Sequence, residues 1–598
     1  MSVRGIAITV VLLGLAFLAG IVAVGLSINQ QAEQADVLRR SYPNDPDTLN
    51  LLTANDNVST AFQSLVYEPL AERDMANPDE WLPVLATRWE FDEESLTYTI
   101  HLRRGVKWHP MRLPNGELLP ETEFTARDVE FTFACIFNEH TEASSYRSYY
   151  ADPDPEDPNH PYKINVEAVD PYTVKIRWSE PYFLAKTWTI GIPILPRHVY
   201  SVDENGEPIA LDFSLKEFAD GFNMHWANTK MCGTGPLVFR EWQRGRRLLL
   251  ERNPDYWGEP YPFRKVIYSY ISNPNTVMRK LLRNELDFAG IQRADQFLEA
   301  HEAPSVEAGN VILASYAYPG YRYIGYNLER ELFQDHRVRW ALSHAVPVQK
   351  IIDEVWKGLA VRITGPFLPG SSAADPSLKP VTFDLGRSRE LLDEAGWIDS
   401  DNNGVRDKVI DGRRVDASFT LMIYSGAPQY LTLAKIVKEN CMKVGVDVNI
   451  EPAKWPLMLQ SLRKRSFDAA MLGWALSWKG DPKQIWHSSQ ADEPDSSNAI
   501  SYRNEQVDRL IEKLHVTLDE EKQTELYRQI HRLIYEDQPY TFLFQDKATA
   551  GYDARIKNVH FYKIRPCVDT SQWRVGPRQP EKANGSGKGE KRKKGNED

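Results

Sequence analysis

The sequence predicts a mixed α/β protein with several compact units, and three observations support this prediction. From residue 37 onward, short strand-like stretches alternate with longer helix-like stretches, and turn signals separate them. The chain has 598 residues, of which 42% are hydrophobic, so it is long enough to bury large cores without disulfide or metal staples. No repeat of solenoid period is visible in it.

Residues 1–35 form a membrane anchor or signal segment. Residues 6–28 carry no charge and are almost wholly apolar. A spanning helix needs about 20 apolar residues, whereas the apolar part of a secretory signal has about 7 to 15. The length favours an uncleaved anchor in the inner membrane, while the small residues Ala23 and Gly25 leave a cleaved signal open. No cysteine precedes Cys135, which excludes a lipid-modified anchor. We expect the remaining chain on the extracytoplasmic side of the cell envelope.

Strands are predicted where apolar and polar residues alternate. Residues 97–102 (TYTIHL) and 172–178 (YTVKIRW) have this period of two. Residues 237–242 and 246–251, separated by the sequence QRG, predict a β-hairpin.

Helices are predicted from their capping residues. Thr125 followed by Asp128 opens a helical pattern through Phe133. Thr517 followed by Glu520 opens another. One face of that second helix carries Leu526, Ile530, Leu533 and Ile534.

Two segments predict irregular structure. The proline-rich residues 152–161 lack the donors that a helix or a central strand needs, so we expect a surface loop. Residues 578–598 are polar, basic and almost free of apolar side chains, which predicts a disordered tail.

Charge and motifs exclude several functions. The chain has 71 basic and 83 acidic side chains, a net charge of −12, which disfavours nucleic acid as a partner. It contains no G-x-S-x-G, Walker A, H-E-x-x-H or G-x-G-x-x-G motif. We therefore expect no enzyme, no catalytic residue and no cofactor. Paired carboxylates leave an exported hydrolase as a weaker alternative.

Cysteines and acidic residues offer little metal chemistry. The thiols show no metal-binding spacing, so two disulfides in any of three pairings, or buried free thiols, stay open. They are Cys135, Cys232, Cys441 and Cys567. The segment WIDSDNNGVRDK follows the first positions of a calcium loop with Asp399, Asp401, Asn403, Gly404 and Asp407. Its twelfth position is Ile410 instead of glutamate, which favours a polar turn without metal.

A series of stretches in fixed order resembles one known family over residues 37–575. The stretches are DPDTLN (45–50), LVYEPL (65–70), LATRWEFDEESLTYTIHLRRGVKWH (85–109), FTARDVEFTF (124–133), CGTGPLVFREW (232–242), ERNPDYWG (251–258), IGYN (324–327), DHRVRWALSHAV (335–346), LLDEAGW (391–397), GDPKQIWHSSQ (480–490) and YRNEQVDRLIEK (502–513). In this order they resemble the family 5 extracellular solute-binding proteins of ABC importers, which include dipeptide- and oligopeptide-binding proteins.

The resemblance implies a two-lobed periplasmic-binding-protein type II fold. The first lobe would comprise residues 37–65, 188–315 and 535–577, with residues 66–187 inserted as an extra subdomain. Residues 316–534 would form the second lobe. Two chain crossings between the lobes would permit closure as rigid bodies.

The resemblance also implies a function. The protein would be a monomer that captures an oligopeptide or similar extended solute by lobe closure and delivers it to the permease subunits of an ABC importer. The alternative is a membrane-tethered receptor that uses the same fold to signal.

Ligand-binding residues are implied by the same relatives, in which an aspartate shortly after a tryptophan holds the ligand's ammonium group. Trp474 matches the tryptophan, but Ser477 or Trp478 occupies the place of the aspartate, and Asp481 lies beyond it. A serine does not neutralise a buried ammonium, so free peptide termini are less expected as ligands. Trp474 as a core residue and Asp481 as a turn former are the structural alternatives.

Other candidates complete the predicted site. Asn55 and Asp56 align near a ligand-contacting acidic residue, although Asp56 also suits a helix N-cap. The remaining candidates are Asn327, Trp486, His487 and Tyr502. Packing within the second lobe is the alternative role for the last three.

Overall fold

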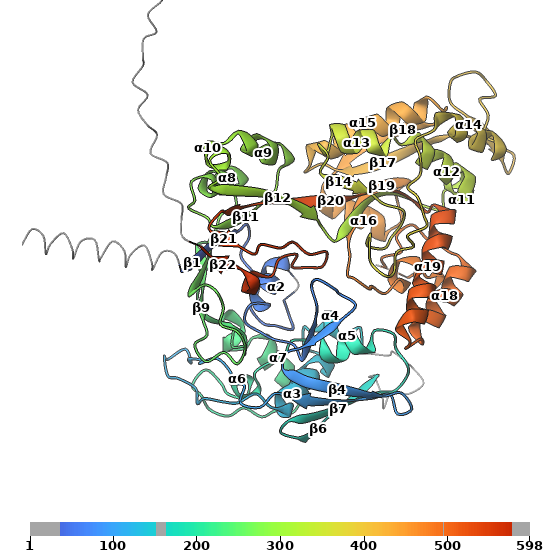
Figure 1. Cartoon of the computed structure of the whole chain (residues 1–598). Coiled ribbons are helices and arrows are strands. Elements are labelled where there is room, and N and C mark those ends of the chain that lie inside the picture. Colours follow the sequence, from blue (N-terminus) through green and yellow to red (C-terminus); the bar gives the residue numbers. More distant parts are fainter. Residues whose placement is uncertain (1–35, 55, 151–162, 494–495, 577–598) are drawn as a thin grey trace, which may run out of the picture.

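A computed structural model describes residues 36–54, 56–150, 163–493 and 496–576 (Figure 1). The predicted anchor at 6–28, the proline-rich loop at 152–161 and the basic tail at 578–598 lie outside the described residues, and so does Asn55. Among the helices that are described, none is both long and apolar enough to cross a membrane.

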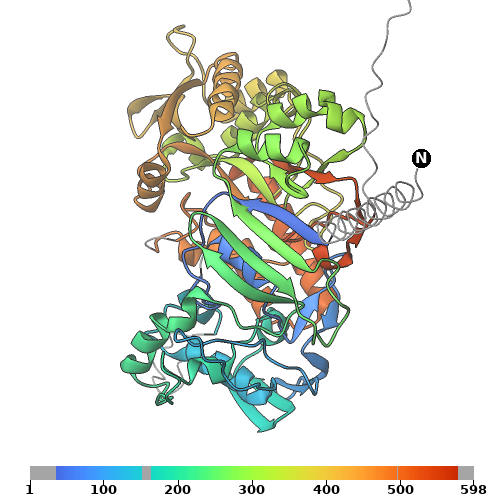
Figure 2. The same ribbon diagram turned by 90° about the vertical axis from the view of Figure 1, so that its left-hand side faces the viewer.

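The first sheet is formed by the segment that follows the N-terminal region and by residues from the middle of the chain. Its order is β1-β10-β9-β8, with β1 parallel to β10 and the other neighbours antiparallel (Figure 2). The strands are β1 (Val37–Tyr42), β8 (Leu237–Gln243), β9 (Arg247–Arg252) and β10 (Lys265–Tyr270). Strands β8 and β9 confirm the predicted hairpin.

A second four-stranded sheet is wholly antiparallel and lies in the lower part of Figure 1. Its order is β4 (Ala86–Asp92), β5 (Thr97–Leu102), β7 (Thr173–Trp178) and β6 (Ile164–Asp170). Helix α3 (Ala126–Phe137) packs against β6 and begins with a capping box between Thr125 and Asp128. Both predicted strands and the predicted capping of α3 are confirmed.

The third sheet has eight strands and joins the two sides of the molecule. Its central path is β11-β20-β13-β19-β17-β18, and β12 and β14 also pair with β20. The strands are β11 (Phe288–Ile291), β12 (Val311–Ala317), β13 (Gly320–Tyr326), β14 (Ala360–Arg362), β17 (Ser418–Tyr424), β18 (Asp447–Ala453), β19 (Ala469–Ala475) and β20 (Tyr540–Asp553).

Strand β20 crosses between the two sides. Its first part pairs with β13 and β14, and its second part pairs with β11 and β12 (Figure 1). A second crossing, at residues 318–319, connects β12 to β13. The crossings lie side by side, because the Tyr318 N–H donates to the Asp546 carbonyl at 3.0 Å.

Helices cover the sheet on the β13 side. They include α12 (His336–Ala345), α14 (Leu385–Glu394) and α15 (Pro428–Met442), which pack around a core that contains Phe333, Leu392 and Phe419. Helices α18 (Glu505–His515) and α19 (Glu520–Asp537) pack against each other and extend toward the lower layer on the right of Figure 1.

The predicted face of α19 is confirmed, but the predicted cap is wrong. Leu526, Ile530 and Ile534 are buried, as the spacing indicates. Asp519, not Thr517, is the N-cap, and its side chain accepts a hydrogen bond from the Lys522 N–H. The Thr517 hydroxyl instead donates to the Lys513 carbonyl at 2.6 Å, so it satisfies a carbonyl group in the last turn of α18.

Several of the stretches that carry the family resemblance meet in one buried node. The Glu68 carboxylate accepts hydrogen bonds from Thr234 Oγ1 at 2.7 Å, Tyr256 OH at 2.7 Å and Trp257 Nε1 at 3.0 Å. Burial raises the pKa of Glu68, and these three donors oppose the rise. A β-carbon on Gly233 would lie 1.8 Å from the Val66 carbonyl oxygen, so only glycine fits there.

His109 belongs to the same node and is neutral at physiological pH. Its Nε2 donates to the Gly235 carbonyl at 2.8 Å, and its Nδ1 accepts from the Gly233 N–H at 3.3 Å. Burial lowers the pKa of His109 from 6.5 to about 4. The unfolded chain takes up this proton near pH 6.5 and the folded chain does not, so the stability that His109 contributes above pH 6.5 is lost as the pH falls toward 4.

We expect this loss to be measurable by comparison with His109→Gln. The wild-type advantage in free energy of unfolding should shrink by about 2 kcal/mol between pH 7 and pH 5. Urea unfolding at both pH values tests this, and His336→Gln, at a histidine whose side chain is 60% exposed, is the control. An advantage over His109→Gln that does not change with pH would contradict the assignment.

Candidate functional site

A cavity of about 510 Å³ lies where three parts of the chain meet. It is lined by residues 75–79 before the lower sheet, by residues 370–372, Trp478 and Arg528 on the β13 side, and by residues 561–563 after β20. Ligand pockets usually occupy about 300 to 1,000 Å³. Two further cavities, of about 170 and 100 Å³, are smaller than this range. The 510 Å³ cavity is therefore the candidate site.

One carboxylate connects the two sides of this cavity. Asp79 Oδ1 accepts hydrogen bonds from Trp478 Nε1 at 3.0 Å and Ser372 Oγ at 3.1 Å, and it lies 3.1 Å from Lys479 Nζ. The Lys479 side chain is only 8% exposed. Burial opposes ionisation of Asp79, but these partners lower its pKa below the ordinary value. We call these contacts the Asp79 bridge.

A second set of contacts joins the end of α18 and the start of α19 to residues 183–186. The Phe183 ring stacks on the His515 ring with centroids 5.1 Å apart, and the Phe183 N–H donates to the His515 carbonyl at 2.9 Å. Lys186 Nζ lies 2.7 Å from Glu520 Oε1. These contacts and the Asp79 bridge hold the lower layer against the β13 side.

A polar network surrounds the two chain crossings. Asp546 Oδ2 accepts from Arg322 Nε at 2.7 Å, and its Oδ1 accepts from Trp356 Nε1 at 3.0 Å. Gln545 Nε2 donates to the Tyr318 carbonyl at 2.8 Å. The crossings are thus held by side-chain hydrogen bonds as well as by backbone pairing.

Of the predicted ligand-binding residues, Trp478 lines the cavity. Ser477, next to it, is exposed. Trp474 lies on β19, is partly buried and packs against the large core. Asp481 forms the turn before Trp486, because it accepts from the Lys483 N–H at 2.8 Å, and it also pairs with His515 Nε2 at 2.9 Å.

The other predicted residues have structural partners. Asp56 is the N-cap of α2 (Asn57–Gln63) and accepts from the Val58 and Ser59 N–H groups at 2.9 and 2.8 Å. Asn327 is buried and donates to the carbonyls of Arg465 and Phe467. None of Asp56, Asn327 or Asp481 lines the cavity.

The aromatic candidates Trp486 and Tyr502 are packed inside the protein. Trp486 and Tyr502 are each 1% exposed, and their rings contact each other edge to face. The Tyr502 hydroxyl donates to Asp537 at 2.6 Å. His487 bonds to Ser489 Oγ at 2.9 Å. A ligand-binding role for these side chains stays a prediction, and their packing agrees with the alternative.

Sequence reasoning did not find most of the cavity. It missed the lining residues Asp79, Ser371, Arg528 and Lys563, and also Lys479, which pairs with Asp79. The only local signal was the position of Lys479 directly after Trp478 in SWKGD.

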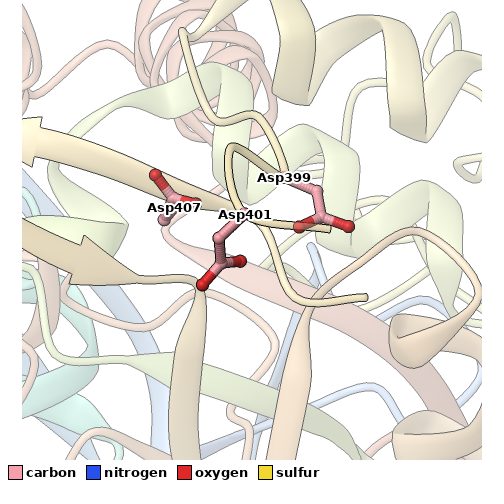
Figure 3. Close-up of side chains that lie close together, drawn as sticks. All are labelled: Asp399, Asp401 and Asp407. Atoms are coloured by element: carbon pink, nitrogen blue, oxygen red, sulfur yellow. The ribbon is translucent and has the colours of Figure 1, made fainter. Parts of the chain in front are cut away.

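The acidic loop at residues 399–407 behaves as a polar turn. Carboxylate oxygens of Asp399, Asp401 and Asp407 lie within 4.8 Å of one another (Figure 3). Arg414 Nη2 lies 2.6 Å from Asp401 and 3.1 Å from Asp407, so a cation of this chain already compensates part of the charge. Gly404 has a φ of 88°, as expected for such a turn.

The cysteines are buried free thiols, the second of the two expected states. They are Cys135, Cys232, Cys441 and Cys567. Burial raises the pKa of each thiol, which leaves it protonated and unreactive.

Known proteins and solved structures resemble this chain over most of its length. The oligopeptide-binding protein AppA of Bacillus subtilis is 28% identical over 535 residues, which cover 88% of each chain. Its structure in complex with a nonapeptide covers 90% of this chain and 99% of AppA, with a TM-score of 0.66. The structure of NikZ from Campylobacter jejuni in complex with Ni(L-His) is 23% identical, covers 90% of this chain and 99% of NikZ, and gives a TM-score of 0.67.

These likenesses confirm the predicted two-lobed type II architecture, in which β20 and residues 318–319 join the lobes. The sequence pattern of the bacterial extracellular solute-binding proteins, family 5, matches residues 80–495, which is more than half of the chain. The chain therefore belongs to the family 5 bacterial extracellular solute-binding proteins.

Proposed function

We propose that this protein captures an oligopeptide or a similar extended solute in the 510 Å³ cavity and delivers it to the permease subunits of an ABC importer. Family 5 proteins are transport receptors and not enzymes, and the chain shares this solute-binding role. The observation that carries the proposal is the cavity itself, since its lining comes from segments on both sides of the interface.

Lobe closure is the proposed mode of capture. Strand β20 and residues 318–319 are the backbone crossings about which the lobes would rotate. A ligand that contacts both linings gains contacts only when the lobes are together, so it stabilises that state. The Asp79 bridge would contribute to the same state without the ligand.

A peptide ligand is supported by the relatives rather than by a single side chain. AppA of B. subtilis is a peptide-binding protein by name, and NikZ holds a nickel–histidine complex, so the fold accepts different solutes. The cavity is large enough for a short peptide and is lined by both apolar and charged groups.

The place of action would be the extracytoplasmic side of the membrane, with residues 6–28 as the anchor. An anchor keeps a receptor near its permease, as a lipid would. We expect the full-length chain to require detergent. Recovery of a soluble chain whose N-terminus lies near Leu26 would contradict the anchor and indicate a cleaved signal.

Native mass spectrometry of full-length protein, gently purified in mild detergent, tests the binding role. We expect a mass surplus that fits a peptide and that disappears after unfolding and refolding. A randomised tetrapeptide pool should then restore a surplus. Trp478→Ala should weaken this binding roughly tenfold or more, because the ring lines the cavity.

Trp455→Ala is the matched control, because that ring is 47% exposed and lies outside the cavity lining. Equal binding by both variants would argue against this cavity as the site. The absence of binding by any peptide would contradict the peptide proposal.

A further inference from the structure

Within the described part of the chain, three hydrogen-bond donors that line the cavity have no partner. The Ser371 hydroxyl is buried without an acceptor in a residue that is 6% exposed. Arg528 Nε is also buried without an acceptor, and its guanidinium makes no ion pair with a described carboxylate. Lys563, which is exposed, makes no ion pair within the described ranges.

Arg532, one turn later on the same helix, has the carboxylate partners that Arg528 lacks among the described residues. Arg532 lies 3.0 Å from Asp375 and 3.1 Å from Glu525 and so pairs with two carboxylates. Both arginines belong to α19, but only Arg528 lines the cavity. A buried donor that lacks a partner costs free energy, so an acceptor that enters the cavity is favoured there.

Gly370 places Lys563 beside this region. Its φ is +79°, and a β-carbon on it would lie 2.9 Å from Lys563 Nζ. The ammonium group therefore lies against the loop that carries Ser371. Any larger residue at position 370 would displace it.

The cavity wall carries too little negative charge to neutralise Arg528 and Lys563. Asp79 is the only carboxylate among the described lining residues, and its Oδ1 already serves Trp478, Ser372 and Lys479. Asp74 and Asp569 lie near Tyr562 but do not line the cavity. The unpaired donors that line this cavity would thus be satisfied by an anionic acceptor.

We propose that Arg528, together with Lys563 and Ser371, forms a subsite for an anionic group of the ligand, with a carboxylate as its simplest form. The inference rests on the proposed binding function and defines the ligand class further. A guanidinium binds a carboxylate with two parallel hydrogen bonds, and the partly dehydrated wall strengthens the interaction. Ser371 would add one donor, and Lys563 would add charge.

The test uses full-length protein and three tetrapeptide pools at low ionic strength. One pool has free carboxyl termini, the second has amidated termini, and the third is amidated but contains one glutamate. The variants are Arg528→Gln and Ser371→Ala, and Arg532→Gln is the control on the same helix. Succinate serves as a small dianionic probe that requires no peptide. Affinity is measured by native mass spectrometry, and folding by thermal unfolding.

We expect wild type to bind the free-carboxylate pool roughly tenfold to a hundredfold more tightly than the amidated pool. Binding of the glutamate pool at similar strength would identify a side-chain carboxylate as an equally good source of the anion. Arg528→Gln should abolish the preference and the binding of succinate. Ser371→Ala should reduce both partly, and Arg532→Gln should preserve them.

Three outcomes would overturn the inference. Equal affinity for the free-carboxylate and amidated pools would refute the subsite while leaving the proposed function intact. A preference for the free-carboxylate pool that persists in Arg528→Gln would do the same. Failure of wild type to bind both the peptides and succinate would refute the subsite and the peptide function together. Succinate binding that depends on Arg528, without peptide binding, would support the subsite and reject peptides as the solute.

Discussion

Asp287→Ala is expected to lower the free energy of unfolding by about 3 kcal/mol. The Asp287 side chain is fully buried, and Arg555, 2.8 Å away, is 2% exposed. The carboxylate also accepts from the Arg39 N–H at 2.7 Å, so from its place directly before β11 it connects to β1 and to Arg555, two residues beyond the end of β20. Its removal takes away the Arg555 guanidinium's shortest carboxylate contact, and the buried guanidinium keeps the Val37 carbonyl at 2.9 Å and the weaker Asp553 contact at 3.5 Å.

Urea unfolding measures this loss, and Asp295→Ala is the matched control. Asp295 pairs with Arg293 on the surface, where both side chains are more than half exposed. Such a pair contributes about 0 to 1 kcal/mol. The double variant Asp287→Leu with Arg555→Met should recover part of the lost stability, because two apolar groups leave no unpaired charge. Similar effects of Asp287→Ala and Asp295→Ala would contradict the expectation.

Local patterns predicted the local elements of this fold well. Alternation in TYTIHL corresponds to β5, whose burial also alternates, and the QRG turn lies between β8 and β9. The helical face of α19 was equally visible, since Leu526, Ile530 and Ile534 share one side of a helix. Each of these features depends on residues within a few positions of one another.

Strand β20 shows what local patterns do not contain. Its first part pairs with strands of one lobe, where Thr541 lies opposite Ile324, and its second part pairs with strands of the other, where Tyr552 lies opposite Ile312. The point at which the pairing passes from one lobe to the other is set by distant strands. A stretch of apolar residues alone does not indicate this point.

The candidate site was hidden for the same reason. Asp79 lies 293 residues from Ser372 and 399 residues from Trp478, and nothing in the sequence near Asp79 indicates either partner. Trp486 and Tyr502 were predicted as binding residues although they are packed in a core. An aromatic residue in a core and one in a binding site have the same local sequence pattern. Only burial separates the two roles, and both side chains are 1% exposed.

The structure also bears on the position after Trp474, where Ser477 or Trp478 replaces the aspartate expected from the family resemblance. Trp478 donates to the Asp79 carboxylate, which comes from the opposite side of the cavity and already faces the Lys479 ammonium. Asp79 is therefore not free to hold a second cation. The unpartnered groups of this cavity are donors, which is why an anionic ligand group fits it better than an ammonium.

Asp79→Ala is expected to lower the apparent ligand affinity about a hundredfold, which corresponds to about 3 kcal/mol. The Lys479 side chain is 8% exposed when the lobes are together, and after the substitution its partner among the described carboxylates is Glu520, 4.0 Å away. When the lobes separate, water solvates the ammonium, so the substitution penalises the closed state alone. Apparent affinity falls with the population of that state.

Asp79→Asn tests the cause, because an amide still accepts from Trp478 and Ser372 but carries no charge. We expect an intermediate loss. Asp220→Ala, which removes an exposed partner of Lys216, is the control. Ligand affinity, together with hydrogen–deuterium exchange of residues 476–480, measures the effect, and exchange there should rise in Asp79→Ala without a lower melting temperature of the lobes. Unchanged affinity and exchange would show that the Asp79 bridge contributes nothing to closure. Other contacts, such as those of residues 183–186 with the end of α18 and the start of α19, would then hold the lobes together.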